Sequence, residues 1–600
     1  MDKLKDGFWI KAGLIGILLT MCLGFGILIG KYICCRPPRT AGIVTTESIP
    51  AERGEIFDCN GKIIAANKTL YDIHIDCCTV SDPKEWEGKS RLLAQELARI
   101  LPEKTAPQWW EYLQNGRRKN KRYLPLAKNI DSTMLDTLCK LPLLNQSQFY
   151  GGRIITRKSG RDYPFGNLAR RSIGVQLAFD QGNMIGLEGR YDEELRGQQG
   201  SRTVKHVLRR GKPKKREISR EEKIDGWDIH CTIDMGLQAI ADSSLRAAVT
   251  EDEDIAGGCF IMMETVSGEI KTMVNISRSL KGIVGEYFNY SIGYSYEPGE
   301  VAQTMALAAA LSDGIVKSLD EKIPTNNGRM CDTIDFTDQY IRAYERNHQT
   351  DSISILDGFT TSSKYVAGNI ALRYSESADY YYEWIRSFSI SSRDFDLYGL
   401  RELDLVNSPR RDDGTLLAMG SGYEFTTAPL QILTFYNAIA NEGRMMRPMI
   451  VKEMKSDVYG TKTFSPTQIG DRVIRQEIAD SLIKALTLCV ENGTGKALRG
   501  LPKKMAGKTG TSRQMIDSEL RGGSEDPYQD NKDRKQYAAT FVGLYPAEAP
   551  EYTAMCVLFT KPTDKKVYGG GKPAEIVRDV TEKSNRYFRR EERFVFILKF

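Results

Sequence analysis

Histidine is scarce in this chain, and its few copies are too dispersed to build a metal site. His74, His206, His230 and His348 are the only four among 600 residues. The 12 cysteines are scattered as well, with no C-x-x-C pair and no spacing typical of zinc ligands. We therefore expect neither a metal ion nor another cofactor.

Charge of one sign is also not in large excess. The formal net charge is +6, which is small for this length, and one basic stretch stands out, near Arg209 to Arg216. A nucleic-acid partner is therefore not expected. The segment from Lys205 to Lys223 is rich in Lys, Arg and Glu and poor in apolar residues, which predicts an exposed linker or a long hairpin. Its basic residues either form a solvated face, which is the simpler interpretation, or meet a membrane surface.

Only one long uncharged apolar run occurs, from Ala12 to Gly30. As a helix rising about 1.5 Å per residue, it matches a bilayer core of about 30 Å. It predicts a membrane anchor over 12–33, preceded by a short tail over 1–11. A cleaved signal peptide is the alternative, but the run is longer than a signal peptide's apolar core, and the basic segment Lys31 to Arg39 stands in place of a small-residue cleavage site. Basic residues on the two sides nearly balance, so charge does not decide the orientation.

The rest of the chain suffices for two or three globular domains, since 41% of all residues are hydrophobic and 27% are charged. Asn60-Gly61, between two alternating apolar runs, predicts a hairpin turn. Thr265 to Gly268 predicts a second hairpin, and residues 85–111 are expected to form a polar helix with an apolar face. Near residue 225 an alternating strand pattern gives way to helical spacing over 238–249, so we place a domain boundary there.

Several longer motifs share one family resemblance. The first part of the chain contains Arg53-Gly-Glu-Ile-Phe-Asp-Cys-Asn-Gly61, Tyr163-Pro-Phe-Gly166 and Gly186-Leu-Glu-Gly-Arg190, in that order. The second part contains Tyr296-Glu-Pro-Gly299 and Lys508-Thr-Gly-Thr511. Together they resemble the signatures of class B penicillin-binding proteins, the membrane-anchored peptidoglycan D,D-transpeptidases, and in particular those of the division type.

The resemblance implies an α+β architecture. A single transmembrane helix would be followed by an elongated mixed pedestal domain, the dimerisation domain of the family, over 34–224. A domain over 225–590 would have the penicillin-binding transpeptidase fold, a five-stranded antiparallel sheet flanked by helices. The tail over 591–600 lies outside the resemblance and is expected to form a strand or a weak surface anchor.

The family also implies a location and partners. The protein would be a single-pass protein of the bacterial cytoplasmic (inner) membrane, held by residues 12–33, with the bulk of the chain extracytoplasmic or periplasmic. The expected partners are a peptidoglycan stem peptide, a polytopic glycosyltransferase and other division or elongation proteins. Dimer formation is a further expectation.

The serine motif of the family is replaced in this sequence. Acyl transfer needs a serine nucleophile and a base that takes its proton, which the family supplies from Ser-x-x-Lys directly after Tyr/Thr-Glu-Pro-Gly. Here that tetrad reads Glu300-Val-Ala-Gln303. A glutamate bears no transferable hydroxyl, and a neutral glutamine cannot act as a base. Glu300 also has a purely structural interpretation, because the helix dipole favours an acidic residue in the first turn.

The other two motifs of the family are retained in part or in full. Ser-x-Asn corresponds to Ser362-Ser363-Lys364, in which Lys364 replaces the asparagine. The third motif is intact as Lys508, Thr509, Gly510 and Thr511. In the family, this strand pairs with the substrate backbone by strand addition, its lysine attracts the substrate carboxylate, and a nearby backbone N–H completes the oxyanion hole.

Three functions are compatible with these motifs. The first is a catalytically inactive scaffold, regulator or partner in peptidoglycan synthesis or division, in which Glu300 pairs with Lys364 or Lys508 and partly occludes the cleft. The second is an active D,D-transpeptidase with its nucleophile elsewhere, although Ser481 and Ser81, which begin literal S-x-x-K matches, lie outside the frame of the motif. The third is a module that binds stem peptides without covalent chemistry.

Overall fold

The structure, a computed structural model, describes residues 13, 15–26, 43–175, 185–209, 212–331, 334–337, 339–405, 413–522, 524–565 and 567–598. The chain forms two compact units. Unit 1 comprises Met1–Glu52 and Gly197–Gly226, and unit 2 comprises Arg53–Arg196 and Trp227–Phe600. A segment from the middle of the sequence therefore joins the N-terminal part, and it interrupts unit 2.

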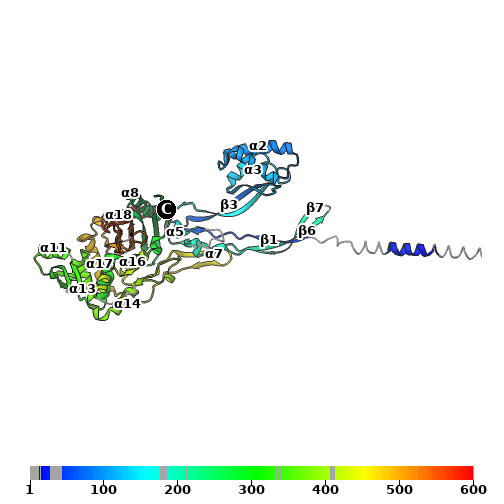
Figure 1. The fold of residues 1–600 in the computed structure, drawn as a ribbon. Helices are drawn as coiled ribbons and strands as arrows, with labels where there is room; N and C mark the ends of the chain where they lie inside the picture. The colour runs from blue at the N-terminus through cyan, green and yellow to red at the C-terminus, as the bar shows by residue number, and fades with distance from the viewer. Residues whose placement is uncertain are drawn as a thin grey trace, which may run out of the picture. The chain divides into compact units, whose positions relative to one another are not determined.

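Unit 1 contains a three-stranded antiparallel sheet in the order β1-β6-β7 (Figure 1). Its strands are β1 (Ile43–Ile49), β6 (Gly200–Arg209) and β7 (Lys212–Glu221). The register places Ile43 opposite His206 and Ile49 opposite Gly200. The hairpin predicted around Lys205 to Lys223 is confirmed, because β6 and β7 pair from Ser201 to Arg209.

Unit 2 begins with a tight hairpin between β2 (Ile56–Phe57) and β3 (Ile63–Ile75). The Asp58 carboxylate accepts hydrogen bonds from the backbone N–H groups of Asn60 and Lys62, each at 2.8 Å. Gly61 adopts a φ of +79°, which is the left-handed conformation that glycine enters without steric cost. The turn predicted at Asn60-Gly61 is therefore confirmed.

These strands belong to a seven-stranded sheet in the order β19-β18-β8-β2-β3-β4, with β5 paired to β3. The remaining strands are β4 (Leu124–Ile130), β5 (Arg153–Asp162), β8 (Asp228–Cys231), β18 (Val451–Ser456) and β19 (Gly460–Thr463). β2 and β8 pair in parallel, with Ile56 opposite Ile229. The expected boundary near residue 225 thus separates two segments that contribute neighbouring strands to one sheet.

Two helices replace the single helix predicted over 85–111. α2 (Pro83–Ile100) and α3 (Ala106–Arg118) are separated by a short loop. Leu101 is extended, with φ −118° and ψ 90°, because a residue before a proline, here Pro102, is disfavoured in the helical region. The two helices bury their apolar faces together with β3 and β4, in a cluster that contains Trp86, Leu93, Leu97, Trp109, Leu113 and Leu124.

A buried ion network joins two of the family motifs of the first part. The Arg53 Nε donates to Glu188 Oε2 at 2.9 Å, and the Arg161 Nε donates to Glu188 Oε1 at 2.6 Å. The Glu188 side chain is fully buried on α6 (Gly186–Arg190), and Arg53 has a second carboxylate partner in Asp192 at 2.7 Å. Residues that resemble signatures in the sequence therefore hold distant segments of unit 2 together.

The second part of unit 2 is built on a six-stranded antiparallel sheet in the order β11-β10-β9-β22-β21-β20. Its strands are β9 (Ile255–Glu264), β10 (Ile270–Arg278), β11 (Val284–Gly285), β20 (Ala506–Gln514), β21 (Gln536–Tyr545) and β22 (Tyr552–Thr560). The prediction of five strands is corrected by the two-residue β11, which returns to pair with β10 after a turn at Gly282 with φ +79°. The hairpin predicted at Thr265 to Gly268 joins β9 to β10 and is confirmed.

Helices cover both faces of this sheet. Phe260 and Met262 of β9 pack into one core with α8 (Met235–Glu251) and α18 (Lys572–Leu598), while the alternating Ile261 and Met263 pack into another core with α16 (Pro429–Ala440). Side chains alternate between the faces of a strand, so a sheet buried on both faces has near-continuous apolar strands. β20 is the outermost strand on one side and borders the candidate site.

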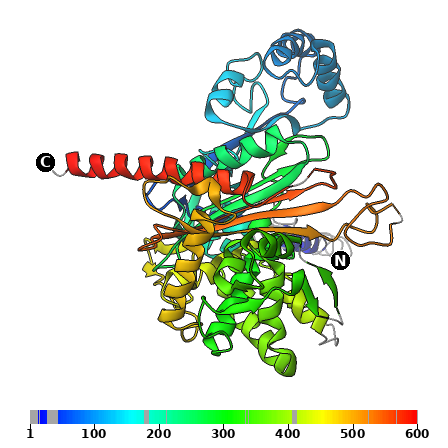
Figure 2. The same ribbon diagram turned by 90° about the vertical axis from the view of Figure 1, so that its left-hand side faces the viewer.

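The last helix corrects one of the two expectations for the tail over 591–600, the strand, while the weak surface anchor stays a prediction. The backbone of residues 591–598 continues α18 and forms neither a strand nor a separate element. Pro573 lies in the first turn of this helix, and no proline or glycine follows it up to Leu598, so no residue type breaks the helix. Figure 2 shows the end of α18 extending away from the sheet. Residues 599 and 600 lie outside the described residues.

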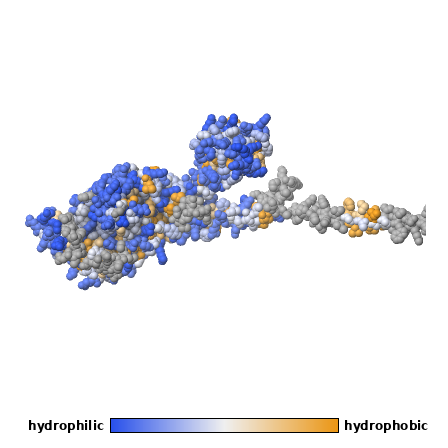
Figure 3. Space-filling model, viewed as in Figure 1, coloured by the Kyte–Doolittle hydropathy of each residue, from blue (hydrophilic) through white to orange (hydrophobic). Residues whose placement is uncertain are grey.

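The predicted membrane anchor lies only partly within the described residues. Residues 13 and 15–26 are helical and include exposed Ile15, Leu18 and Phe25 (Figure 3), whereas 1–12, 14 and 27–33 are not described. Among the described residues, no helix combines the length and the apolar composition needed to cross a membrane.

Candidate functional site

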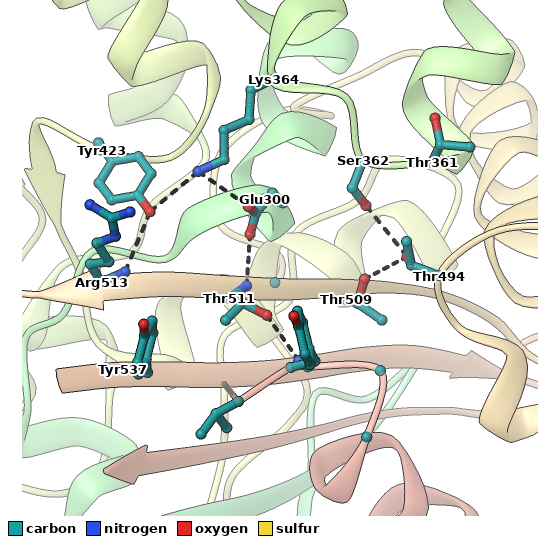
Figure 4. Close-up of a pocket in the computed structure, with 16 residues that line it drawn as sticks. Glu300, Thr361, Ser362, Lys364, Tyr423, Thr494, Thr509, Thr511, Arg513 and Tyr537 are labelled. Carbon is teal, nitrogen blue, oxygen red and sulfur yellow. Dashed lines mark hydrogen bonds and ion pairs between the residues drawn. The ribbon is translucent and has the colours of Figure 1, made fainter. Parts of the chain in front are cut away.

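A pocket of about 730 Å³ lies along the outer edge of β20. Besides β20, its walls come from the segment that contains Glu300, from the loop before α13 (Lys364–Leu372), and from a glycine-rich loop over 567–571 (Figure 4). The lining residues are Glu300, Thr361, Ser362, Lys364, Tyr423, Thr494, Thr509, Gly510, Thr511, Arg513, Tyr537, Val567, Tyr568, Gly569, Gly570 and Gly571. The structure therefore brings all three sequence motifs to one pocket.

Glu300 lies on a one-turn 3-10 helix, η1 (Gly299–Ala302), that leads into α10 (Gln303–Ser312). Its Oε2 accepts a hydrogen bond from the backbone N–H of Thr511 at 2.7 Å, and its Oε1 is 3.4 Å from Lys364 Nζ. Figure 4 shows the carboxylate between these two groups. The predicted ion pair is confirmed, and its partner is Lys364. The carboxylate faces the pocket, so its role goes beyond an acidic residue at a helix start.

Gln303 is buried where the family has its lysine. Its Nε2 lies 3.4 Å from the backbone oxygen of Ser362 and 3.5 Å from that of Ser363, and the residue is 2% exposed. A neutral amide held by two carbonyl oxygens has no proton-accepting nitrogen. Gln303 therefore ties α10 to the loop before α13 and cannot activate a nucleophile.

Ser362, which lines the pocket, contacts the amine of Lys508, which does not line it. Lys508 Nζ donates to Ser362 Oγ at 2.6 Å, and Lys508 is fully buried. Burial lowers the pKa of the Lys508 ammonium. Ser362 adopts a φ of +60°, an uncommon conformation for a residue other than glycine. Lys508 was predicted to bind substrate, and its contact with Ser362 was not predicted from the sequence.

Lys364 is held from two sides. Its Nζ is 3.4 Å from Tyr423 Oη and lies 4.8 Å from the centre of the Tyr423 ring, with Glu300 opposite. Burial alone would lower the pKa of Lys364, but the Glu300 carboxylate and Tyr423 outweigh it and raise the pKa above its ordinary value. Lys364 is therefore a charged member of the pocket wall.

Two outward N–H groups of β20 are occupied by side chains of the chain itself. The Thr511 N–H donates to Glu300, and the Arg513 N–H donates to Tyr423 Oη at 3.4 Å. These residues are two positions apart, so both N–H groups point away from β21. A peptide that adds to this edge would have to displace both acceptors.

The ion pair of Glu300 and Lys364 is expected to contribute a measurable coupling energy. Because Lys364 is partly exposed, we expect about 1 kcal/mol between Glu300→Gln and Lys364→Met in a double-mutant cycle on unfolding free energy. The measurement is urea unfolding of the four proteins. Additive effects of the two substitutions would show that the two side chains do not interact.

Comparison with known proteins places this geometry in a family. Residues 258–582, more than half of the chain, match the penicillin binding protein transpeptidase domain, and residues 48–231 match the penicillin-binding protein dimerisation domain. The chain belongs to the class B penicillin-binding proteins. The predicted family is therefore confirmed, as is a mixed α+β transpeptidase fold with a dimerisation domain.

Known penicillin-binding proteins are similar to this one over most of their length. Penicillin-binding protein 3 of Bacillus subtilis (strain 168) is 24% identical over 516 residues, which cover 80% of this chain and 71% of the relative. Peptidoglycan D,D-transpeptidase FtsI of Escherichia coli (strain K12) is 24% identical over 546 residues, covering 88% and 82%. The crystal structure of penicillin binding protein 2X from Streptococcus thermophilus has a TM-score of 0.67 at 20% identity, with 90% and 80% covered, and shows the shared fold.

Two pocket residues of this penicillin-binding protein were not predicted from its sequence. Thr494 Oγ1 lies 2.6 Å from Thr509 Oγ1 and 3.4 Å from Ser362 Oγ, so it links the second and third motifs. Tyr423 links Lys364 to β20. Thr494 lies in Asn492-Gly-Thr-Gly-Lys496, a turn-like sequence that could have indicated a loop beside the strand. Nothing in the sequence around Tyr423 indicates its contact with a lysine some 60 positions away.

Glu297, in the motif before Glu300, makes stability depend on pH. It is 4% exposed, and burial raises its pKa to about 7. Hydrogen bonds from the Glu424 N–H and from Tyr528 oppose this rise in pKa, whereas the charge of the Glu424 carboxylate adds to it. The folded protein therefore holds a proton that the unfolded chain releases above its ordinary pKa of 4.5, so stability falls as pH rises toward 7. We expect the free energy of unfolding to fall by about 3 kcal/mol from pH 4.5 to above pH 7 because of Glu297. Glu297→Gln should abolish this contribution to the pH dependence.

Urea midpoints at several pH values between 4.5 and 8 measure this effect. Glu424→Gln serves as the matched control, because it removes a neighbouring carboxylate and leaves the buried group in place. Parallel pH profiles for the native protein and Glu297→Gln would contradict the assignment.

Proposed function

We propose that this class B penicillin-binding protein acts in bacterial cell-wall synthesis or division without transpeptidase activity of its own. Its role would be that of a scaffold, regulator or partner. The observation that carries the proposal is the position of the Glu300 carboxylate, at 2.7 Å from the Thr511 N–H. In an active member, we expect that N–H to stabilise the oxyanion formed when serine attacks. Here an anion of the protein already accepts its hydrogen bond.

The pocket has a second property that supports this proposal. An incoming substrate carbonyl would compete with the Glu300 carboxylate for the Thr511 N–H. That carboxylate is also held by an ion pair with Lys364, at 3.4 Å. Hydrogen bonds to charged acceptors are stronger than those to neutral ones. Displacing Glu300 would also leave its charge without the Thr511 N–H. The site is therefore blocked in addition to lacking a nucleophile.

The organisation that we propose follows the family. Residues 1–11 form a cytoplasmic tail, 12–33 anchor the chain in the inner membrane, 34–224 form the pedestal, and 225–590 form the transpeptidase-like domain on the extracytoplasmic side. The pedestal and the anchor would contact a polytopic glycosyltransferase and other division or elongation proteins. The relative FtsI of Escherichia coli, whose name describes a peptidoglycan D,D-transpeptidase, supports a role in peptidoglycan synthesis.

A donor assay tests the absence of activity. The full-length chain in detergent is given a thioester analogue of a D-alanyl donor and a D-amino acid acceptor. We expect thiol release and transfer product at the background rate of the buffer. A rate that scales with the amount of protein would contradict the proposal.

One observation favours an active enzyme as the second candidate. The 2.6 Å contact of Ser362 Oγ with the buried Lys508 Nζ is the arrangement of a nucleophile with a nearby base. In that case the rate in the donor assay would disappear in Ser362→Ala. Ser481→Ala is the matched control, because Ser481 is a serine of α17 (Gln476–Glu491) that does not line the pocket.

A non-covalent stem-peptide module remains the third candidate, supported by the outermost position of β20 in its sheet. Glu300 and Tyr423 compete with such a peptide for the edge. Titration with a peptide ending in D-Ala-D-Ala would therefore detect binding more readily with Glu300→Gln than with the native chain, whose carboxylate is the stronger acceptor.

A further inference from the structure

The β6–β7 hairpin of unit 1, whose strands are labelled in Figure 1, ends in a segment rich in basic residues. We call it the basic hairpin end, and it comprises Lys205, Arg209, Lys212, Lys214, Lys215 and Arg216. No aspartate or glutamate occurs between Lys205 and Arg216. An ordinary solvated face mixes charges of both signs, so this segment needs another explanation.

The register places these cations opposite one another. Lys205 lies opposite Arg216, and Arg209 lies opposite Lys212. Like charges directly opposite each other on neighbouring strands destabilise a sheet. An anionic partner would relieve that repulsion.

The other end of the same hairpin is different. Arg202 forms an ion pair with Glu47 of β1 at 2.7 Å, and Arg220 forms one with Glu222 at 2.8 Å. Carboxylates of the chain therefore neutralise cations at that end. β1 has no carboxylate near the basic hairpin end, because its residues there are Ile43 and Val44.

The basic hairpin end also lies on the side from which the N-terminal segment enters the sheet. Ile43, the first residue of β1, lies opposite His206, and β6 continues past it through Val207, Leu208 and Arg209. The predicted anchor ends at residue 33, and the nine residues 34–42 span at most about 30 Å when fully extended. The chain connection therefore keeps this end of the sheet near the surface of the bilayer. Val44 lies opposite Lys205 and is 54% exposed, so it provides an apolar side chain at the same end of the sheet.

We propose that the basic hairpin end docks on the phosphate groups of anionic phospholipids in the extracytoplasmic leaflet. The inference rests on the membrane anchor of the proposed function and on no property of the pocket. Cations near an anionic membrane surface each strengthen binding about fivefold, and the attraction falls off within a Debye length. Docking would add a second point of attachment beside the anchor and fix the orientation of the three-stranded sheet against the membrane.

Trypsin tests this directly, since it cleaves after Lys and Arg. The full-length chain is reconstituted in phosphatidylcholine vesicles with or without one part in four of phosphatidylglycerol, and the cleavage rates are followed by mass spectrometry of the peptides. We expect cleavage within 205–216 to be at least about tenfold slower on the anionic vesicles. The exposed basic loop at 119–122 of unit 2 is the internal control and should be cleaved at equal rates on both. In 1 M salt, where the Debye length is about 3 Å, the protection should disappear.

The matched variant is Lys212→Glu/Lys214→Glu/Lys215→Glu, which retains Arg209 and Arg216 as cleavage sites. It also converts the pair of Arg209 with residue 212 into one of opposite charges, so the hairpin itself is not weakened. We expect this variant to lose the difference between the two vesicle types.

Equal cleavage of the native hairpin on both vesicle types would overturn the proposal. Protection that persists in 1 M salt or on neutral vesicles would also overturn it. Such protection would assign the surface to another occupant, such as a second copy of the chain. Flotation of the native chain with the vesicles separates the two claims. A chain that floats without protection contradicts only the docking, whereas a chain that does not float contradicts the anchor itself.

Discussion

If the native chain lacks activity as proposed, the triple substitution Glu300→Ser, Gln303→Lys and Lys364→Asn is expected to make it one that penicillin acylates. The change supplies a nucleophile and its base, frees the Thr511 N–H from the carboxylate, and removes the cation that Glu300 neutralises. Loss of an acyl-transfer nucleophile typically costs on the order of a millionfold in turnover. We therefore expect the rate of acylation to rise by several orders of magnitude in the triple variant. A fluorescent penicillin on a denaturing gel measures the covalent product.

Two partial variants separate the contributions to this gain. Glu300→Ser alone lacks the base, because Gln303 remains a neutral amide. The double substitution Glu300→Ser/Gln303→Lys supplies the base but leaves Lys364 without its carboxylate and adds a second cation nearby, so we expect it to be labelled less than the triple variant. A folded triple variant without label would show that the rest of the pocket no longer fits the reaction.

Removal of Glu188 is expected to destabilise unit 2 more than any single change in the pocket. Its side chain is fully buried between Arg53 and Arg161, whose side chains are 7% and 3% exposed. Glu188→Ala would leave two guanidinium groups buried beside each other, and loss of one partner of a buried pair costs about 3–5 kcal/mol. Thermal or urea unfolding measures the effect.

An exposed ion pair of the same domain provides the control. Arg99 contacts Glu96 one turn away on α2, and their side chains are 75% and 37% exposed. Arg99→Ala is expected to cost about 0.5 kcal/mol or less. If Glu188→Ala were as mild as this control, the buried network would not hold the domain together.

The family and the main elements of the fold were predictable because they depend on local sequence patterns. Asn60-Gly61 fixes a turn through the conformation of one glycine and the carboxylate of Asp58, and both are read from adjacent residues. The intact Lys508-Thr-Gly-Thr511 strand and the replaced Glu300 were predictable from motif order. An ion pair of Glu300 with Lys364 or Lys508 was also predictable, since their motifs share one pocket, but the choice of Lys364 was not.

Other features depend on contacts that no local pattern records. The approach of Lys508 to Ser362, within 2.6 Å, joins residues 146 positions apart. Tyr423 reaches both Lys364 and β20 from a third segment. The extra strand β11 is two residues long, which is too short for an alternating pattern. The break between α2 and α3 was readable in principle from Pro102, but the apolar face continues on both sides of it.

Under the proposed function, the native chain is not acylated, because Glu300 replaces the nucleophile of the family and accepts the hydrogen bond of the Thr511 N–H. The most direct test of this claim is the intact mass of the full-length native protein after prolonged incubation with benzylpenicillin, measured beside the triple variant. We predict an unchanged mass for the native chain and the addition of one penicillin for the variant. A native chain that gains one penicillin, mapped by peptide analysis to Ser362 or to another serine, would contradict the account.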